Sequence, residues 1–152
     1  MTTPLIGEFE GRRISRMLAR LNVGHLQPGE QVAVRGEETD GWAHLIFELT
    51  GGATQYRVEA RLDCKRNKIR PADAKEMLLD LLGHLFTAYL KAPREPFTGP
   101  KWEEIEYDGR PVFLRGQERA DEAEGAATQL LRQDAKRRSR QAAAGTSGEQ
   151  ES

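Results

Sequence analysis

Residues 42–90 read WAHLIFELTGGATQYRVEARLDCKRNKIRPADAKEMLLDLLGHLFTAYL, and they carry the clearest structural pattern in the chain. Two runs in this stretch, residues 42–50 and 55–63, alternate apolar and polar side chains with the period of two typical of β-strands. Gly51 and Gly52 lie between the runs, and glycine readily takes the positive φ of a tight turn. The pattern therefore predicts an antiparallel hairpin with one strongly apolar face.

A long helix is predicted directly after this hairpin, over residues 71–91. Pro71 suits its first turn, because an N–H group there would have no partner within the helix. The apolar residues of the segment recur at helical spacing along one broad stripe: Met77, Leu78, Leu81, Leu82, Leu85, Phe86 and Tyr89. Packing this stripe on the apolar face of the hairpin gives the predicted core.

Shorter signals flank this unit on both sides. Before it, apolar residues at helical spacing predict a basic helix over residues 14–21, and residues 31–35 alternate as a short edge strand. After it, Asp108 and Gly109 predict a type I′ turn between strands 102–107 and 110–115. Pro111 lacks an N–H group, so the second of these strands is expected at a sheet edge.

Together these elements predict an α+β fold for a single domain over residues 1–117. An antiparallel sheet, made of a three-strand meander plus a second hairpin, is covered by one long amphipathic helix. Residues 118–140 contain helix formers but few large apolar side chains, which predicts a solvated charged helix. Residues 141–152 have nothing to bury, and a disordered tail is expected there.

Composition limits the class of protein. The chain has 152 residues, of which 38% are hydrophobic and 31% charged, as is typical of a soluble globular domain. The sequence contains no apolar run long enough for a membrane span and no secretory signal, so a cytoplasmic location is expected. Cys64 is the single cysteine, which excludes an internal disulfide and a cysteine-based zinc site.

No constellation of residues amounts to an active site. The chain has three histidines, and it lacks the HExxH, CxxC, GxSxG and glycine-rich phosphate-loop patterns. Lys65 and Arg66 could lower the pKa of the Cys64 thiol, but a lone cysteine without a partner base is usually passive. We therefore expect a non-enzymatic protein, and we assign no catalytic, cofactor-binding or metal-binding residue.

An interaction surface is predicted on the sheet face that points away from the long helix. Trp42, His44 and Ile46 lie on this face of the first strand, and Arg57 and Arg61 lie on it in the second. A single covering helix would leave the apolar side chains of Trp42 and Ile46 exposed, and an exposed apolar patch often marks an interface. The expected partner is another protein, including a second copy of the chain as a homodimer.

Three basic segments suggest an alternative function. They comprise Arg12, Arg13, Arg16 and Arg20; then Lys65, Arg66, Lys68 and Arg70; then Arg132, Lys136, Arg137, Arg138 and Arg140. If the fold brought the segments together, they would form a positive surface able to bind the phosphates of RNA or DNA. The sequence pI near 6.3 weighs against this, because dedicated nucleic-acid binders usually carry a positive excess.

The order of elements resembles two known folds. The sequence helix, three strands, helix resembles the double-stranded RNA-binding domain, with residues 65–70 as the basic loop before the second helix. The predicted helix over residues 71–91 is rich in leucine. The corresponding helix of the double-stranded RNA-binding domain is rich in small residues. The fuller order, with two more strands and a helix, resembles the class I chaperones of type III secretion. This resemblance implies an adaptor or chaperone-like regulator that acts on another protein.

Overall fold

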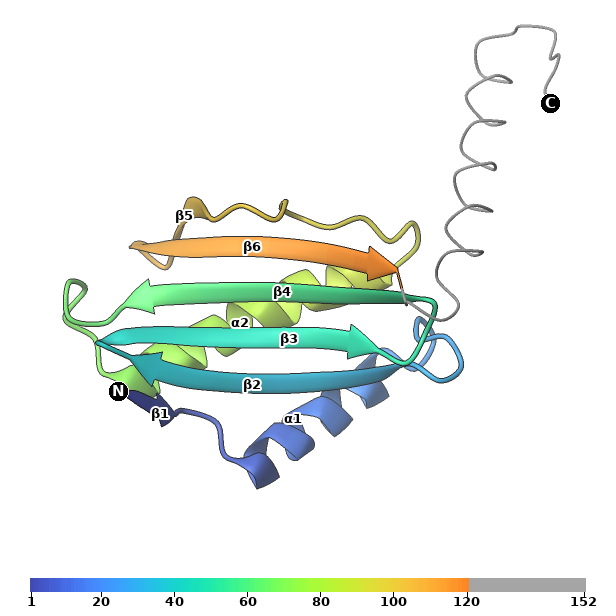
Figure 1. Cartoon of the computed structure of the whole chain (residues 1–152), viewed down its shortest axis with the longest axis horizontal. Coiled ribbons are helices and arrows are strands. Elements are labelled where there is room, and N and C mark those ends of the chain that lie inside the picture. Colours follow the sequence, from blue (N-terminus) through green and yellow to red (C-terminus); the bar gives the residue numbers. More distant parts are fainter. Residues whose placement is uncertain (121–152) are drawn as a thin grey trace, which may run out of the picture. The chain divides into compact units, whose positions relative to one another are not determined.

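The computed structural model describes residues 1–120 (Figure 1). The described elements follow in the order β1 (Thr2–Pro4), α1 (Glu8–Leu21), β2 (Gln31–Thr39), β3 (Trp42–Thr50), β4 (Thr54–Asp63), α2 (Pro71–Leu90), β5 (Glu103–Tyr107) and β6 (Arg110–Ala120). The helix predicted from residue 118 is wrong at its start, because β6 continues through residues 118–120. The rest of that helix, residues 121–140, and the tail at 141–152 lie outside the described residues.

All six strands belong to one sheet, in the order β1-β2-β3-β4-β6-β5. The meander β2-β3-β4 is confirmed, and its strands pair antiparallel, with Phe47 opposite Val58 and Val34. The second hairpin joins the same sheet beside β4 (Figure 1). Its turn is confirmed, because Asp108 and Gly109 both have a positive φ. β1 was not predicted.

The edge position predicted for β6 is wrong, since β6 lies between β4 and β5. Pro111 is the second residue of this strand and pairs in register with Glu106. A proline near the start of a strand removes a ladder hydrogen bond only where pairing begins. The strand therefore tolerates it within the sheet.

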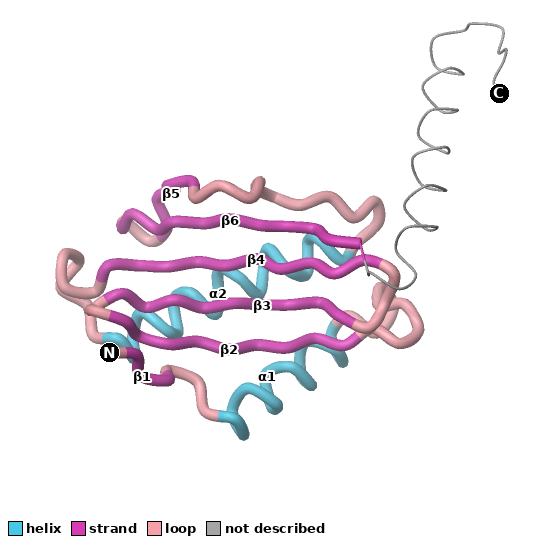
Figure 2. Tube along the Cα trace, viewed as in Figure 1, coloured by secondary structure: helices cyan, strands magenta, loops and turns pink. Residues whose placement is uncertain are grey.

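Both helices lie on one face of the sheet (Figure 2). α2 packs on β3 and β4, as predicted, and α1 packs on β2. Tyr56 of β4 stacks on Tyr89 of α2 with their ring centroids 3.6 Å apart, and Phe47 of β3 meets Phe86 edge-on. The prediction of a single covering helix is therefore wrong, because α1 extends the helical layer over the sheet.

α1 is longer than predicted and includes Gly11. A Cβ atom on Gly11 would lie 3.0 Å from the backbone oxygen of Val34, so glycine lets the helix approach β2 closely. Ile14 and Leu18 then bury their side chains in the core. No helix within residues 1–120 is long and apolar enough to cross a membrane.

Candidate functional site

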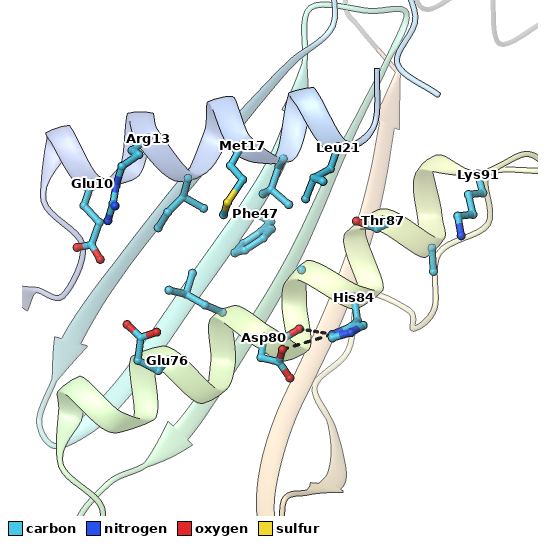
Figure 3. A pocket seen from close by; sticks show the side chains of 15 residues that line it. Glu10, Arg13, Met17, Leu21, Phe47, Glu76, Asp80, His84, Thr87 and Lys91 are labelled. Carbon is cyan, nitrogen blue, oxygen red and sulfur yellow. Dashed lines mark hydrogen bonds and ion pairs between the residues drawn. The ribbon is translucent and has the colours of Figure 1, made fainter. Parts of the chain in front are cut away.

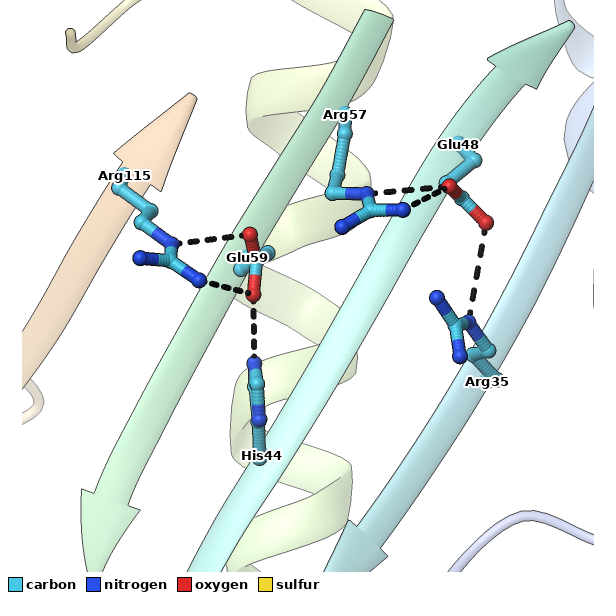
Figure 4. A network of polar contacts seen from close by, with 6 residues as sticks. All are labelled: Arg35, His44, Glu48, Arg57, Glu59 and Arg115. Carbon is cyan, nitrogen blue, oxygen red and sulfur yellow. Dashed lines mark hydrogen bonds and ion pairs between the residues drawn. The ribbon is translucent and has the colours of Figure 1, made fainter. Parts of the chain in front are cut away.

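The sheet face opposite the helices carries an ion-pair network (Figure 4). The carboxylate of Glu59 on β4 accepts hydrogen bonds from His44 on β3 at 2.8 Å and from Arg115 on β6 at 2.9 Å. Burial by itself would raise the pKa of Glu59, but the hydrogen bonds and charges of His44 and Arg115 outweigh it and lower this pKa to about 2. Glu59 is therefore ionised, and both of its carboxylate oxygens already accept hydrogen bonds within the chain.

A second acid on the same face is also paired. Glu48 of β3 accepts two hydrogen bonds from Arg57, at 2.8 and 3.0 Å, and lies 3.7 Å from Arg35 of β2. Three arginines of this face, at positions 35, 57 and 115, are thus engaged by carboxylates within the chain (Figure 4). Their charge is largely compensated before any ligand arrives.

An aromatic cluster occupies the rest of this face. Trp102, which precedes β5, has the guanidinium groups of Arg61 and Arg115 within 4.4 and 4.3 Å of its ring centre. Arg61 also lies 5.1 Å from the ring centre of Trp42, whose ring is 5.8 Å from that of Phe113. These arginine–aromatic contacts are favourable cation–π geometries that hold the face together.

The structure thus brings the predicted interaction residues Trp42, His44, Ile46, Arg57 and Arg61 to one face. The expected exposure of that face is wrong for Ile46, which is only 7% exposed. In register it lies between the long side chains of its neighbours on β2 and β4, at positions 35 and 59. Long charged side chains cover apolar surface with their aliphatic stems, which explains the burial of Ile46.

A groove with a mostly apolar lining runs between α1 and α2 (Figure 3). One wall carries Met17 and Leu21 of α1, which are 54% and 72% exposed, and the other carries Leu79 and Gly83 of α2. Phe47 of β3 also lines the groove, whose volume is about 770 Å³. The predictions missed this surface, because they assigned no covering role to α1.

The two ends of the groove differ in charge. α1 and α2 run in the same direction, so Glu10, Arg13 and Glu76 lie toward one end and Lys91 lies at the other (Figure 3). Asp80 and His84 lie between the two ends. Lys75 contacts Glu10 at 3.2 Å and neutralises it. Glu76 is exposed and has no ion-pair partner within residues 1–120.

On its other side, α1 forms a cleft with the outer edge of β2, lined by both apolar and charged side chains. This cleft has a volume of about 640 Å³ and is lined by residues 30–35 and by side chains of α1 that include Arg12 and Arg16. β1 pairs only with residues 37–39 of β2. Residues 31–35 therefore have no neighbouring strand on this edge in the part of the chain that the structure describes.

The basic segments lie in different elements. Lys65, Arg66, Lys68 and Arg70 are exposed in the turn between β4 and α2, and Arg70 pairs with Asp73. The arginines of the first segment, at positions 12, 13, 16 and 20, are exposed on α1. The third segment, Arg132 to Arg140, lies outside the described residues. Within residues 1–120, no hydrogen bond or ion pair joins the first two segments.

Cys64 and His84 are the other described side chains considered for chemistry, and His84 lies 3.7 Å from the carboxylate of Asp80. Burial raises the pKa of the Cys64 thiol, so the neighbouring cations do not activate it. His84 is exposed and bonds through Nδ1 to the backbone oxygen of Asp80 at 2.7 Å. Within residues 1–120, no group of three or more histidine, cysteine or acidic side chains is arranged to hold a metal ion.

Comparison of the chain with models of known protein families found no match, and neither did comparison with curated proteins or with solved structures.

Proposed function

We propose that the protein is a small non-enzymatic interaction module, an adaptor or chaperone-like regulator, that binds an extended segment of a partner protein along the edge of β2. The observation that carries this proposal is the unpaired edge at residues 31–35, which lines a cleft beside α1. An exposed strand edge is a template for another strand, because its N–H and C=O groups lack partners. Partner proteins commonly exploit such an edge by adding a strand to the sheet.

The backbone groups available for pairing follow from strand alternation. The N–H of Leu5 donates to the carbonyl oxygen of Gly36 at 2.9 Å, so the backbone groups of Gly36 point outward from the sheet. Those of Val34 and Val32, two and four residues earlier, point the same way. α1 covers the carbonyl of Val34 through Gly11. The N–H and C=O of Val32 and the N–H of Val34 have no partner within residues 1–120.

Glu8, Glu30 and Arg35 also line the cleft, but each is paired within the chain, so the unpaired charge of the lining favours an acidic segment. Arg16 is exposed and has no ion pair in the described part of the chain, and Arg12 contacts only Glu8, at 3.6 Å. Guanidinium groups bind carboxylates with two parallel hydrogen bonds. An incoming strand with acidic side chains would therefore gain both main-chain pairing with β2 and ion pairs with α1.

The test uses an octapeptide of alternating glutamate and valine, with a lysine–valine octapeptide as the matched control. We expect the acidic peptide to bind at least about tenfold more tightly. Its binding should shift the NMR amide signals of Val32 and Val34. N-methylation of the peptide at the residues that face β2 should abolish binding, whereas N-methylation at the alternate residues should not.

Two variants of α1 distinguish binding in the cleft from a general effect of the charge of the helix. Arg16→Glu should weaken binding of the acidic peptide, because Arg16 lines the cleft. Arg20→Glu changes the same charge on the same helix outside the cleft and should have little effect. Equal binding of the acidic and basic peptides, or unchanged amide signals for Val32 and Val34, would refute the proposal.

A second candidate function, binding of RNA or DNA, is favoured by the turn between β4 and α2. The side chains of Lys65, Arg66 and Lys68 are exposed there and form no ion pair within residues 1–120. Binding to a single-stranded oligonucleotide should then fall steeply as salt rises, and should be lost when these residues and Arg70 are replaced by alanine. Retention that does not depend on salt would exclude this function.

A further inference from the structure

We infer that the groove between α1 and α2 binds α1 of a second copy of the chain, so that two copies form a symmetric dimer. This inference is independent of the proposed β2 site, because the groove and the β2 cleft share no lining residue. α1 forms one wall of the groove and also offers the side chains that would fill the groove of the partner. A surface that is both wall and occupant produces an isologous contact, which closes at two copies.

The apolar side chains of α1 supply the driving force. Met17 and Leu21 follow the buried Ile14 and Leu18 by one turn, yet they are 54% and 72% exposed. In the dimer, Met17 and Leu21 of each copy enter the groove of the other copy. The apolar side chains of both copies are then removed from contact with water. The gain is roughly 25 cal/mol for each Å² of apolar surface removed from water.

The wall formed by α2 admits a helix at close range. A Cβ atom built on Gly83 meets no other atom within 4 Å, so this part of the wall is open. Thr87 and Ala88, one turn further along, also line the groove and are small. Small side chains let two helices approach closely, so this wall suits a helix as occupant.

The charges along the groove set the direction of the second helix. Glu76 lies toward the end where α1 and α2 begin, and Asp80, which is paired with His84 and Tyr107, lies midway along the groove (Figure 3). On α1, Arg13 and Arg20 are exposed and have no ion pair in the described residues. If the second α1 runs antiparallel to the first, its Arg20 lies at the acidic end of the groove. The helix dipoles also attract each other in that orientation.

The mass of the full chain in solution tests the dimer. Sedimentation equilibrium at about 200 µM should give twice the chain mass of 17.1 kDa. The double substitution Met17→Glu and Leu21→Glu should weaken association by more than about 30-fold, because it buries unpaired charges. Circular dichroism and the melting temperature report whether that variant still folds. Val23→Glu alters an apolar residue that is 77% exposed and outside the groove, so it should remain dimeric.

A charge exchange tests the antiparallel arrangement. Glu76→Arg alone and Arg20→Glu alone should each weaken the dimer by about threefold, and the two together should restore it. A monomeric wild-type chain, or a dimer unaffected by charges at positions 17 and 21, would overturn the inference. Failure of the exchange to restore association would also overturn it, because the proposed occupant would be wrong. A monomer that still binds the acidic octapeptide would leave the β2 site intact.

Discussion

The two sides of α1 differ in what they offer a ligand. Toward α2, Met17 and Leu21 are apolar and line a groove that Phe47 closes from below. Toward β2, Arg12 and Arg16 line a cleft beside unpaired backbone groups. Apolar burial is non-directional, whereas main-chain pairing fixes the direction and register of its ligand. One helix thus lies between a surface suited to stable association and a surface suited to binding an extended segment in a fixed register.

The largest expected effect tests whether the groove depends on the core. Phe47 is 1% exposed and packs edge-on against Phe86, with their ring centroids 5.8 Å apart. Phe47→Ala should lower the free energy of unfolding by about 3–5 kcal/mol, because it leaves a cavity under the groove. Urea denaturation measures this change. Phe9→Ala removes the same side chain from a position that is 65% exposed, so its effect should stay below about 0.5 kcal/mol. Similar losses for both variants would contradict the packing described for the groove.

The next effect comes from Glu59 on the sheet face opposite the helices. A change there should not affect binding on either side of α1. The folded-state pKa of Glu59 is lowered from 4.5 to about 2, so its stabilisation is fully present above the unfolded pKa. It is lost as pH falls from about 4.5 through about 2, and it amounts to about 3 kcal/mol.

Acid titration of the unfolding free energy measures this contribution. Glu59→Gln should flatten the dependence on pH in that window, because glutamine does not titrate. Glu106→Gln changes an exposed acid of β5 and should leave the slope as it is in the wild type. Peptide binding and dimer formation by the Glu59→Gln variant at neutral pH should not change. An equal flattening by both variants would show that Glu59 is not the group responsible.

β2 to β6 and α2 could be predicted because their signals are local. Alternation along residues 42–63 needs no knowledge of the rest of the chain, and the register confirms it, with Leu45 opposite Ala60. Asp108 and Gly109 likewise specify a turn through their own backbone preferences. Properties that depend on period and on turn chemistry were thus accessible from the sequence.

The candidate surfaces could not be predicted because they depend on contacts between distant segments. Whether Ile46 is exposed depends on long side chains from two neighbouring strands, and whether Met17 lines a groove depends on where α1 docks. Gly11 argues in the sequence against a helix that begins before residue 14, because glycine weakens a helix. The structure shows instead that α1 includes Gly11, which lies against the carbonyl of Val34.

A smaller effect tests how closely α1 packs on the edge of β2. Gly11→Val should destabilise the fold by about 1–3 kcal/mol, because its side chain would press on the backbone oxygen of Val34. Gly83→Ala adds a methyl group where nothing lies within 4 Å, and should stabilise α2 by about 0.5–1 kcal/mol. Urea denaturation of both variants below the dimer concentration measures the difference. A stabilising Gly11→Val would mean that α1 does not rest on the edge of β2.

The smallest effect separates the two sides of α1 by their response to salt. An ion pair at an exposed arginine is screened, so raising NaCl from about 50 to about 500 mM should weaken binding of the acidic peptide by about tenfold. The same change should alter the dimer constant by less than about twofold, because burial of Met17 and Leu21 does not depend on charge and only the Arg20–Glu76 contact is screened. Titrations by fluorescence anisotropy and sedimentation equilibrium in the same buffers measure both constants. If both fell together, the groove would bind by charge, and the contrast between the two sides of α1 would fail. If neither fell, Arg12 and Arg16 would have no part in recognising the segment at β2, and the backbone groups of Val32 and Val34 would have to account for its affinity alone.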